Sequence, residues 1–289
     1  MKSMKRIQLL PNVITAFGLS CGLFVIFKMN MMAPGEVTPQ SLLAVTGILL
    51  LAALADLLDG AVARAMKAES DFGGQFDSLA DAISFGVAPS LIVLKSLSLQ
   101  PGTELSFLMT TAAMVYTVCG ILRLVRFNVT AKQSEGDVQQ IKSNQKNFTG
   151  LPIPAAAAAA VSGNLILVSE EFKSLLTITD DTRAWILFIQ MIVLGYFMIS
   201  RWKFPSFKTL RIRVSSFQMV FITAMTAVIF FYGVLHHFAV VFFFISWFYL
   251  VVAWVLSIIR LISGKKSKTL EDFEPEEELE EIDDEGDDE

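Results

Sequence analysis

The sequence predicts an all-α, polytopic integral membrane protein, folded as a bundle of about eight transmembrane helices with both termini in the cytoplasm. Three observations support this fold class. Hydrophobic residues make up 54% of the 289-residue chain, and the mean hydropathy is +0.57, more than a soluble domain carries. Apolar runs of about 20 residues, the length needed to cross a bilayer, recur along the chain. When these runs are threaded through a membrane in turn, most Lys and Arg residues fall on one side of it.

Eight apolar runs give the predicted helices in chain order. They occupy residues 12–32, 39–62, 77–98, 104–127, 152–170, 183–200, 214–235 and 239–260. With the N-terminus placed inside, only four of the 23 Lys and Arg residues fall on the outer side: Lys28, Lys95, Lys173 and Arg183. The positive-inside rule makes the basic side the cytoplasm, and we expect the protein in the inner membrane of a prokaryote.

Two terminal segments differ from the helical body at 12–266. Residues 1–11 alternate basic with apolar side chains, which predicts an amphipathic segment lying along the membrane interface. Residues 267–289 form an acidic cytoplasmic tail that we expect to be disordered, because half of the 28 acidic residues lie in 271–289 without a basic one. The tail is either a solvated end or a protein-binding or autoinhibitory segment. The remaining basic body suits anionic lipid and nucleotide ligands.

Four aspartates interrupt the apolar sequence: Asp56, Asp59, Asp77 and Asp81. A carboxylate in hydrocarbon costs roughly 2.5–3.5 kcal/mol, so several are tolerated only beside a polar cavity or a partner. Spacings of three and four residues place each pair on one helix face. If the two faces meet, they form an all-oxygen site for Mg²⁺, Mn²⁺ or Ca²⁺. Mg²⁺ commonly shares its ligand shell with substrate phosphates, so the pattern indicates phosphoryl chemistry.

Small and basic residues accompany the aspartates. Gly60 and Ala63 leave room on the first carboxylate-bearing face, and Gly73 does so before the second. Arg64 lies on the first face and can offer bidentate hydrogen bonds to a phosphate. Two alternatives stay open: the small residues can serve helix packing alone, and intramembrane aspartates can form the ion or proton path of a transporter.

The spacing Asp-x2-Asp-Gly-x2-Ala-Arg-x8-Gly-x3-Asp-x3-Asp resembles the signature of the CDP-alcohol phosphatidyltransferases, with every fixed position filled. The resemblance implies that Asp56, Asp59 and Asp77 bind two divalent metals, Mg²⁺ or Mn²⁺. It further implies that Asp81 shares a metal and acts as general base.

The same resemblance implies a pocket for the CDP group lined by Gly60, Arg64 and Gly73. Asn12 and Thr15, on one face of the first predicted helix, are further candidates for nucleotide contact. A plain role as caps of the helix start explains these two residues nearly as well.

Further blocks resemble the phosphatidylserine synthase branch of the family. They are Leu10-Pro-Asn-Val-Ile-Thr15, Ala82-Ile-Ser-Phe-Gly-Val-Ala-Pro89, Arg123-Leu-Val-Arg-Phe-Asn128 and Gly150-Leu-Pro-Ile-Pro154. This resemblance implies transfer of a phosphatidyl group from CDP-diacylglycerol to L-serine, with release of CMP. It also implies a homodimer among membrane lipids, without a nucleic-acid partner. Glycerol-3-phosphate or inositol phosphate is the alternative acceptor.

Three residues are candidates for contacting the acceptor or a lipid phosphate. Ser84 follows Asp81 by three residues, which places a hydroxyl near the expected base or lets it close a local hydrogen bond. Arg123 and Arg126 make a second cationic site at the cytoplasmic end of the fourth helix, suited to a carboxylate or phosphate. Arginines at such helix ends also satisfy the positive-inside rule without any ligand.

Overall fold

The computed structural model describes residues 9–33, 36–66, 70–133, 147–200, 203–205 and 231–263. Within these ranges the regular secondary structure is helical apart from two three-residue strands, which confirms the predicted all-α class. The helices are α2 (Leu9–Met31), α3 (Pro39–Met66), α4 (Asp71–Asp81), η1 (Ala82–Val87), α5 (Ala88–Ser96), α6 (Glu104–Gln133), α8 (Ile153–Val168), α9 (Glu170–Leu175), α10 (Asp180–Ile199) and α12 (Phe238–Ser263).

Five of the described helices are long and apolar enough to cross a membrane. They are α2, α3, the continuous helix Asp71–Ser96 formed by α4, η1 and α5, then Glu104–Thr130 of α6, and α10. Ile153–Val168 and Phe238–Val252 are shorter apolar helices. Every predicted run except 214–235 coincides with one of these helices, and that run lies almost entirely outside the described residues. The chain is therefore an integral membrane protein, while the count of eight spans stays a prediction.

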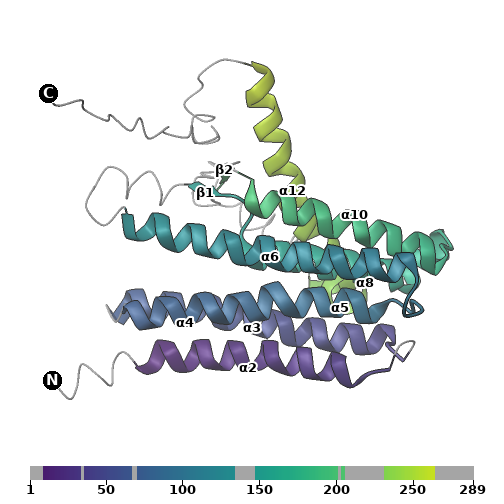
Figure 1. Cartoon of the computed structure of the whole chain (residues 1–289), viewed down its shortest axis with the longest axis horizontal. Helices are drawn as coiled ribbons and strands as arrows, with labels where there is room; N and C mark the ends of the chain where they lie inside the picture. The colour runs from purple at the N-terminus through teal and green to yellow at the C-terminus, as the bar shows by residue number, and fades with distance from the viewer. Residues whose placement is uncertain are drawn as a thin grey trace, which may run out of the picture.

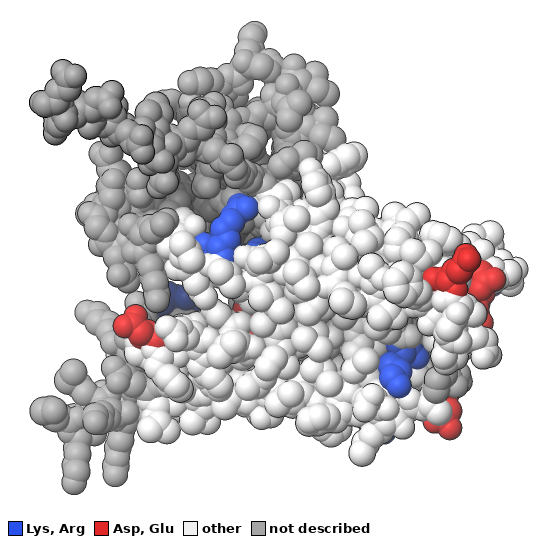
Figure 2. All heavy atoms as spheres, in the orientation of Figure 1, with Lys and Arg blue, Asp and Glu red and all other residues white. Residues whose placement is uncertain are grey.

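The five helices long enough to cross a membrane lie side by side along the longest axis of the molecule, whereas α12 runs across that direction (Figure 1). α2 packs against α3 and α4, α6 packs against α10, and α8 contacts α5, α10 and α12. On the face drawn in Figure 2, the charged side chains lie toward the two ends of the bundle, separated by a broad uncharged surface. This distribution suits helices that cross hydrocarbon with their ends in polar surroundings.

The alanine run of α8 lies in the protein core. Ala159 and Ala160 are fully buried, and the Gln190 amide of α10 donates hydrogen bonds to both of their carbonyls at 3.0 Å. A Cβ added at Gly163 would overlap the Gln190 amide, so the glycine gives that side chain its space. Small residues thus let two helix backbones approach closely.

The helix that carries Asp77 and Asp81 starts earlier than the apolar pattern predicts. Ser70 caps it by accepting a hydrogen bond from the Gly73 N–H at 3.1 Å, and Asp71 in the first turn complements the helix dipole. Both aspartates therefore lie inside a formed helix. After Asp81 the helix widens into the π-helix η1 before continuing as α5.

The start of α8 is fixed against the end of α10 by a tight backbone contact. Gly150 has φ +80°, and a Cβ added there would lie 2.5 Å from the Met198 carbonyl oxygen. The next amide, Leu151 N–H, donates to the Phe197 carbonyl at 3.0 Å. Just before this contact, strand β1 (Asn147–Thr149) pairs antiparallel with β2 (Lys203–Pro205).

Candidate active site

Three aspartates from two helices meet at one end of the bundle. Asp56 and Asp59 project from α3 and Asp77 projects from α4, and one carboxylate oxygen of each lies within 4.8 Å of the others. Asp59 is buried and the other two are partly buried. The expectation that the two carboxylate faces meet is confirmed. An all-oxygen donor set of this kind fits a divalent Mg²⁺, Mn²⁺ or Ca²⁺ ion.

Asp81 lies beside this cluster, one turn along α4 from Asp77. It is within hydrogen-bonding range of Asp56 and interacts electrostatically with Arg123 of α6. All four aspartates line one small cavity, which we call the inner cavity. Asp81 is therefore placed where it can contact both the metal ligands and a group that enters between the helices.

Thr15 of α2 contacts the carboxylate of Asp59. Its buried hydroxyl is 3.1 Å from the Pro11 carbonyl and 2.5 Å from Asp59 Oδ2, to which it donates a hydrogen bond. Because α2 already includes Leu9, neither Thr15 nor Asn12 caps the helix start, and that alternative is wrong. Sequence reasoning missed the contact with Asp59. The available signal was a hydroxyl side chain within an apolar helix.

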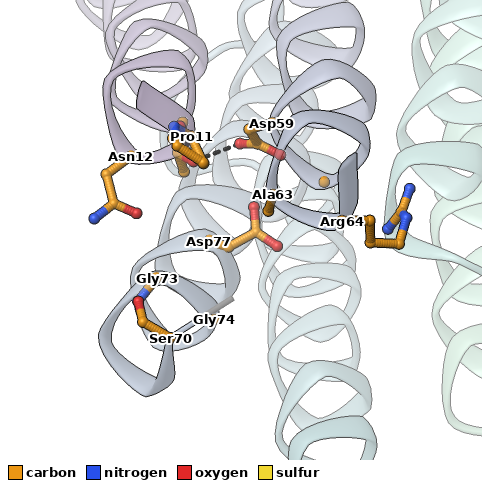
Figure 3. Close-up of a pocket in the computed structure, with 11 residues that line it drawn as sticks. Pro11, Asn12, Asp59, Ala63, Arg64, Ser70, Gly73, Gly74 and Asp77 are labelled. Atoms are coloured by element: carbon orange, nitrogen blue, oxygen red, sulfur yellow. Dashed lines mark hydrogen bonds between the residues drawn. The ribbon is translucent and has the colours of Figure 1, made fainter. Parts of the chain in front are cut away.

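A cavity of about 190 Å³ opens between α2, α3 and α4, and we call it the glycine-lined cavity. Its walls are formed by Pro11, Asn12, Thr15, Asp59, Gly60, Ala63, Arg64, Ser70, Gly73, Gly74 and Asp77. The carboxylate of Asp77 points toward Asp59 on one side of the cavity, and Asn12 lies on the other side (Figure 3). The structure thus brings together all the residues that the sequence assigns to the CDP pocket.

The two motif glycines of this cavity make room for protein side chains. A Cβ at Gly73 would lie 3.1 Å from both Asn12 Oδ1 and Ser70 Oγ. A Cβ at Gly60 would lie 3.2 Å from Arg64 Nη1, so the guanidinium folds back over the glycine. Arg64 also interacts electrostatically with Asp59. Its charge therefore lies at the edge of the carboxylate cluster, on the far side of α3 from Gly73 (Figure 3).

Ser84 lies in the inner cavity together with Asp81, as the spacing predicts. The cavity measures about 10 Å³, close to the lower limit for one water molecule. Ser84 is 2% exposed, and its Oγ has no hydrogen-bond partner within the described residues. On its other side it packs against Gly22 of α2, where an added Cβ would overlap the serine side chain.

Arg123 and Arg126 of α6 line neither of the two cavities. Arg123 stacks over the Phe127 ring, 5.7 Å from its centroid, and lies near Asp81. Arg126 Nη1 donates to the Ile199 carbonyl at 3.2 Å, at the end of α10. Arg123 Nε and Arg126 Nη2 are buried without hydrogen-bond partners among the described residues. Of these two arginines, the structure therefore places Arg123 and not Arg126 beside the carboxylate cluster.

Known proteins resemble this chain over the whole region that forms the site. The family model described as CDP-alcohol phosphatidyltransferase matches residues 8–195. A Helicobacter pylori protein named CDP-diacylglycerol–serine O-phosphatidyltransferase is 32% identical over 217 residues, covering 75% of this chain and 80% of that protein. A Bacillus subtilis protein of the same name is 32% identical over 199 residues, covering 69% and 91%. The chain belongs to the CDP-alcohol phosphatidyltransferase family.

Proposed function

We propose that the protein transfers the phosphatidyl group from CDP-diacylglycerol to L-serine, giving phosphatidylserine and CMP. The observation that carries the proposal is the meeting of Asp56, Asp59 and Asp77 beside the glycine-lined cavity, in a chain that belongs to this family. The names of its relatives support serine as the acceptor.

Asp56, Asp59 and Asp77 would hold two divalent ions, Mg²⁺ or Mn²⁺, with Asp81 sharing one. When bound, such ions offset the charge of the pyrophosphate and of the departing CMP. Thr15 keeps the Asp59 carboxylate oriented by its hydrogen bond. This hydrogen bond would hold the Asp59 carboxylate in place before the substrate binds.

The glycine-lined cavity would receive the phosphates of the CDP group. At about 190 Å³ it is smaller than the 300–1,000 Å³ typical of pockets for whole ligands, so it suits the charged part of the substrate. Gly60, Gly73 and Asn12 shape its walls. Arg64 would bind a phosphate through its guanidinium, turning from its position over Gly60.

Asp81 would act as the general base. It takes the proton from the serine hydroxyl while that oxygen forms a bond to the β-phosphorus, and the phosphorus–oxygen bond to CMP breaks. The position of Asp81 in the inner cavity, next to the metal ligands, supports this role. Arg123 beside Asp81 would receive the serine carboxylate. The active site would face the cytoplasm, where serine and CMP are soluble, in a homodimer within the inner membrane.

A second acceptor class has one observation in its favour. Arg123 and Arg126 each carry a buried nitrogen without a partner among the described residues, and an acceptor with a phosphate, such as glycerol-3-phosphate or inositol phosphate, would supply oxygens for them.

Release of CMP from CDP-diacylglycerol tests the assignment. Purified protein in detergent with Mg²⁺ or Mn²⁺ is given serine, glycerol-3-phosphate, inositol, inositol phosphate or no acceptor in parallel. We expect CMP only with serine. Dependence on another acceptor would keep the phosphotransfer and overturn serine, whereas no CMP from folded, metal-loaded protein would contradict the enzyme and favour a transporter.

A further inference from the structure

The π-helix η1 lies just before Pro89, a residue without a backbone N–H donor. Pro89 has no N–H, so the carbonyls four and five residues before it, those of Phe85 and Ser84, receive no helical hydrogen bond from that position. The Ala88 N–H bonds five residues back, to Ile83, which is the π pattern. The widened turn thus leaves backbone acceptors that another helix must satisfy.

Helix α6 supplies the missing donor through a buried tyrosine. Tyr116 is fully buried, and its Oη donates to the Phe85 carbonyl at 3.1 Å. The hydroxyl of Thr117, the next residue, lies 2.9 Å from the Ala113 carbonyl of its own helix and 3.1 Å from the Gly86 carbonyl, which is also 2.9 Å from Ser90 Oγ. The Phe85 carbonyl thus accepts a side-chain hydrogen bond from Tyr116, whereas the Gly86 carbonyl has two hydroxyls within range, those of Ser90 and Thr117.

The π turn determines where Ser84 lies. The residue precedes the Phe85 carbonyl and lines the inner cavity, and its Oγ lies against Gly22 of α2. A buried hydroxyl without a partner is unfavourable, so a group that enters the cavity and hydrogen-bonds to Ser84 would be bound. The cavity admits a group about the size of a hydroxyl, and its walls include Asp81.

We propose that Tyr116 is a positioning residue: by holding the π turn through the Phe85 carbonyl, it keeps Ser84 at the wall of the inner cavity, where the Ser84 hydroxyl hydrogen-bonds the hydroxyl of the acceptor alcohol. This inference rests on the proposed function and names the subsite for the reacting hydroxyl. Ser84 contacts substrate, and Tyr116 acts through Ser84.

The first test uses a double-mutant cycle on serine-dependent CMP release. Ser84→Ala and Tyr116→Phe should each raise the KM for serine about threefold to tenfold, the effect of one lost hydrogen bond. The Tyr116→Phe change should add nothing in the Ser84→Ala background. The matched control is Thr117→Val, which leaves the Gly86 carbonyl with Ser90 and should change the KM less. Additive effects of the two substitutions, or an unchanged KM, would overturn the proposal.

The second test does not depend on activity. In a chain with Cys21→Ala and Cys119→Ala, Ser84→Cys is labelled with a small methanethiosulfonate reagent, with and without Tyr116→Phe. We expect slow labelling with Tyr116 and labelling at least several-fold faster without it. Equal rates in two variants of equal thermal stability would refute the positioning role even if CMP release fails with every acceptor. Faster labelling alongside absent CMP release would keep the positioning role and reject the proposed function.

Discussion

The Thr15 hydroxyl on α2 donates a hydrogen bond to Asp59 Oδ2 on α3, 44 residues away in the chain. The contact joins the first two described helices at the point where the carboxylate cluster forms. A carboxylate held in this way keeps a fixed orientation before any ion binds.

Replacing Thr15 with Val should weaken metal binding without unfolding the protein, because valine keeps the shape and loses the donor. We expect the Mg²⁺ or Mn²⁺ concentration for half-maximal CMP release to rise about tenfold or more. The control is Thr46→Val on α3, whose buried hydroxyl donates to the Leu42 carbonyl of its own helix. An equal effect of the two substitutions would show that Thr15 has no special relation to the metal site.

Replacing Asp81 with Asn should abolish turnover while CDP-diacylglycerol still binds. Loss of a general base costs about 10²–10⁴-fold in rate, and the three clustered aspartates remain in place. CMP release and binding of a labelled nucleotide are measured on the same preparation. Asp71→Asn, an exposed change on the same helix, serves as control. Retained turnover in Asp81→Asn would remove the residue from the mechanism.

Two glycines with positive φ allow the contact between α8 and α10 to be tested. Alanine at either position costs about 1–2 kcal/mol for the left-handed backbone. At Gly150 the new methyl group would also press on the Met198 carbonyl, whereas at Gly102 it meets open space. Gly150→Ala should therefore lower the melting temperature in detergent clearly more than Gly102→Ala. Equal losses would mean that the contact relaxes without cost.

One pH effect is expected outside the membrane-spanning helices. His237 Nδ1 lies 2.9 Å from Glu171 Oε1, and the hydrogen bond from His237 lowers the pKa of Glu171. A lowered folded pKa stabilises the fold above the ordinary glutamate value of about 4.3, and this contribution disappears as the pH falls through the lowered value. His237→Gln should make the melting temperature fall slightly less between pH 5 and 3. Parallel curves for the two proteins would contradict the coupling.

The spacing of charged residues made the site predictable. Aspartates three and four residues apart share helix faces, and their cost in hydrocarbon favoured a polar site at which the two faces meet. The structure confirms this for Asp56, Asp59 and Asp77. The apolar runs located the described helices because the length and the hydropathy of a membrane-crossing helix can both be read from a single segment of the sequence. The roles of the site residues and the run 214–235 stay predictions.

Contacts between helices escaped the sequence patterns. The bond from Thr15 to Asp59 depends on how α2 rotates against α3, which no periodicity within either helix specifies. The π turn likewise depends on Tyr116, which lies 31 residues from the Phe85 carbonyl that it satisfies. Pro89 was the local sign of an irregular helix, but its position alone does not show which way the turn opens.

The π turn amounts to one residue more than a regular helix between Asp81 and Ala88 would need. Each residue of an α-helix turns the chain by about 100°, and each residue of a π turn turns it by less, because the wider turn holds more residues. Deleting one residue from 82–87 would therefore restore a regular helix while α4 and α5 keep roughly their present relation. The face of Ser90 would still meet Thr117 of α6, from which its hydroxyl now lies 2.8 Å away, and Asp77 would stay in place. When relatives of this chain are aligned, a one-residue gap in this short stretch would mark those that carry a regular helix in place of the π turn.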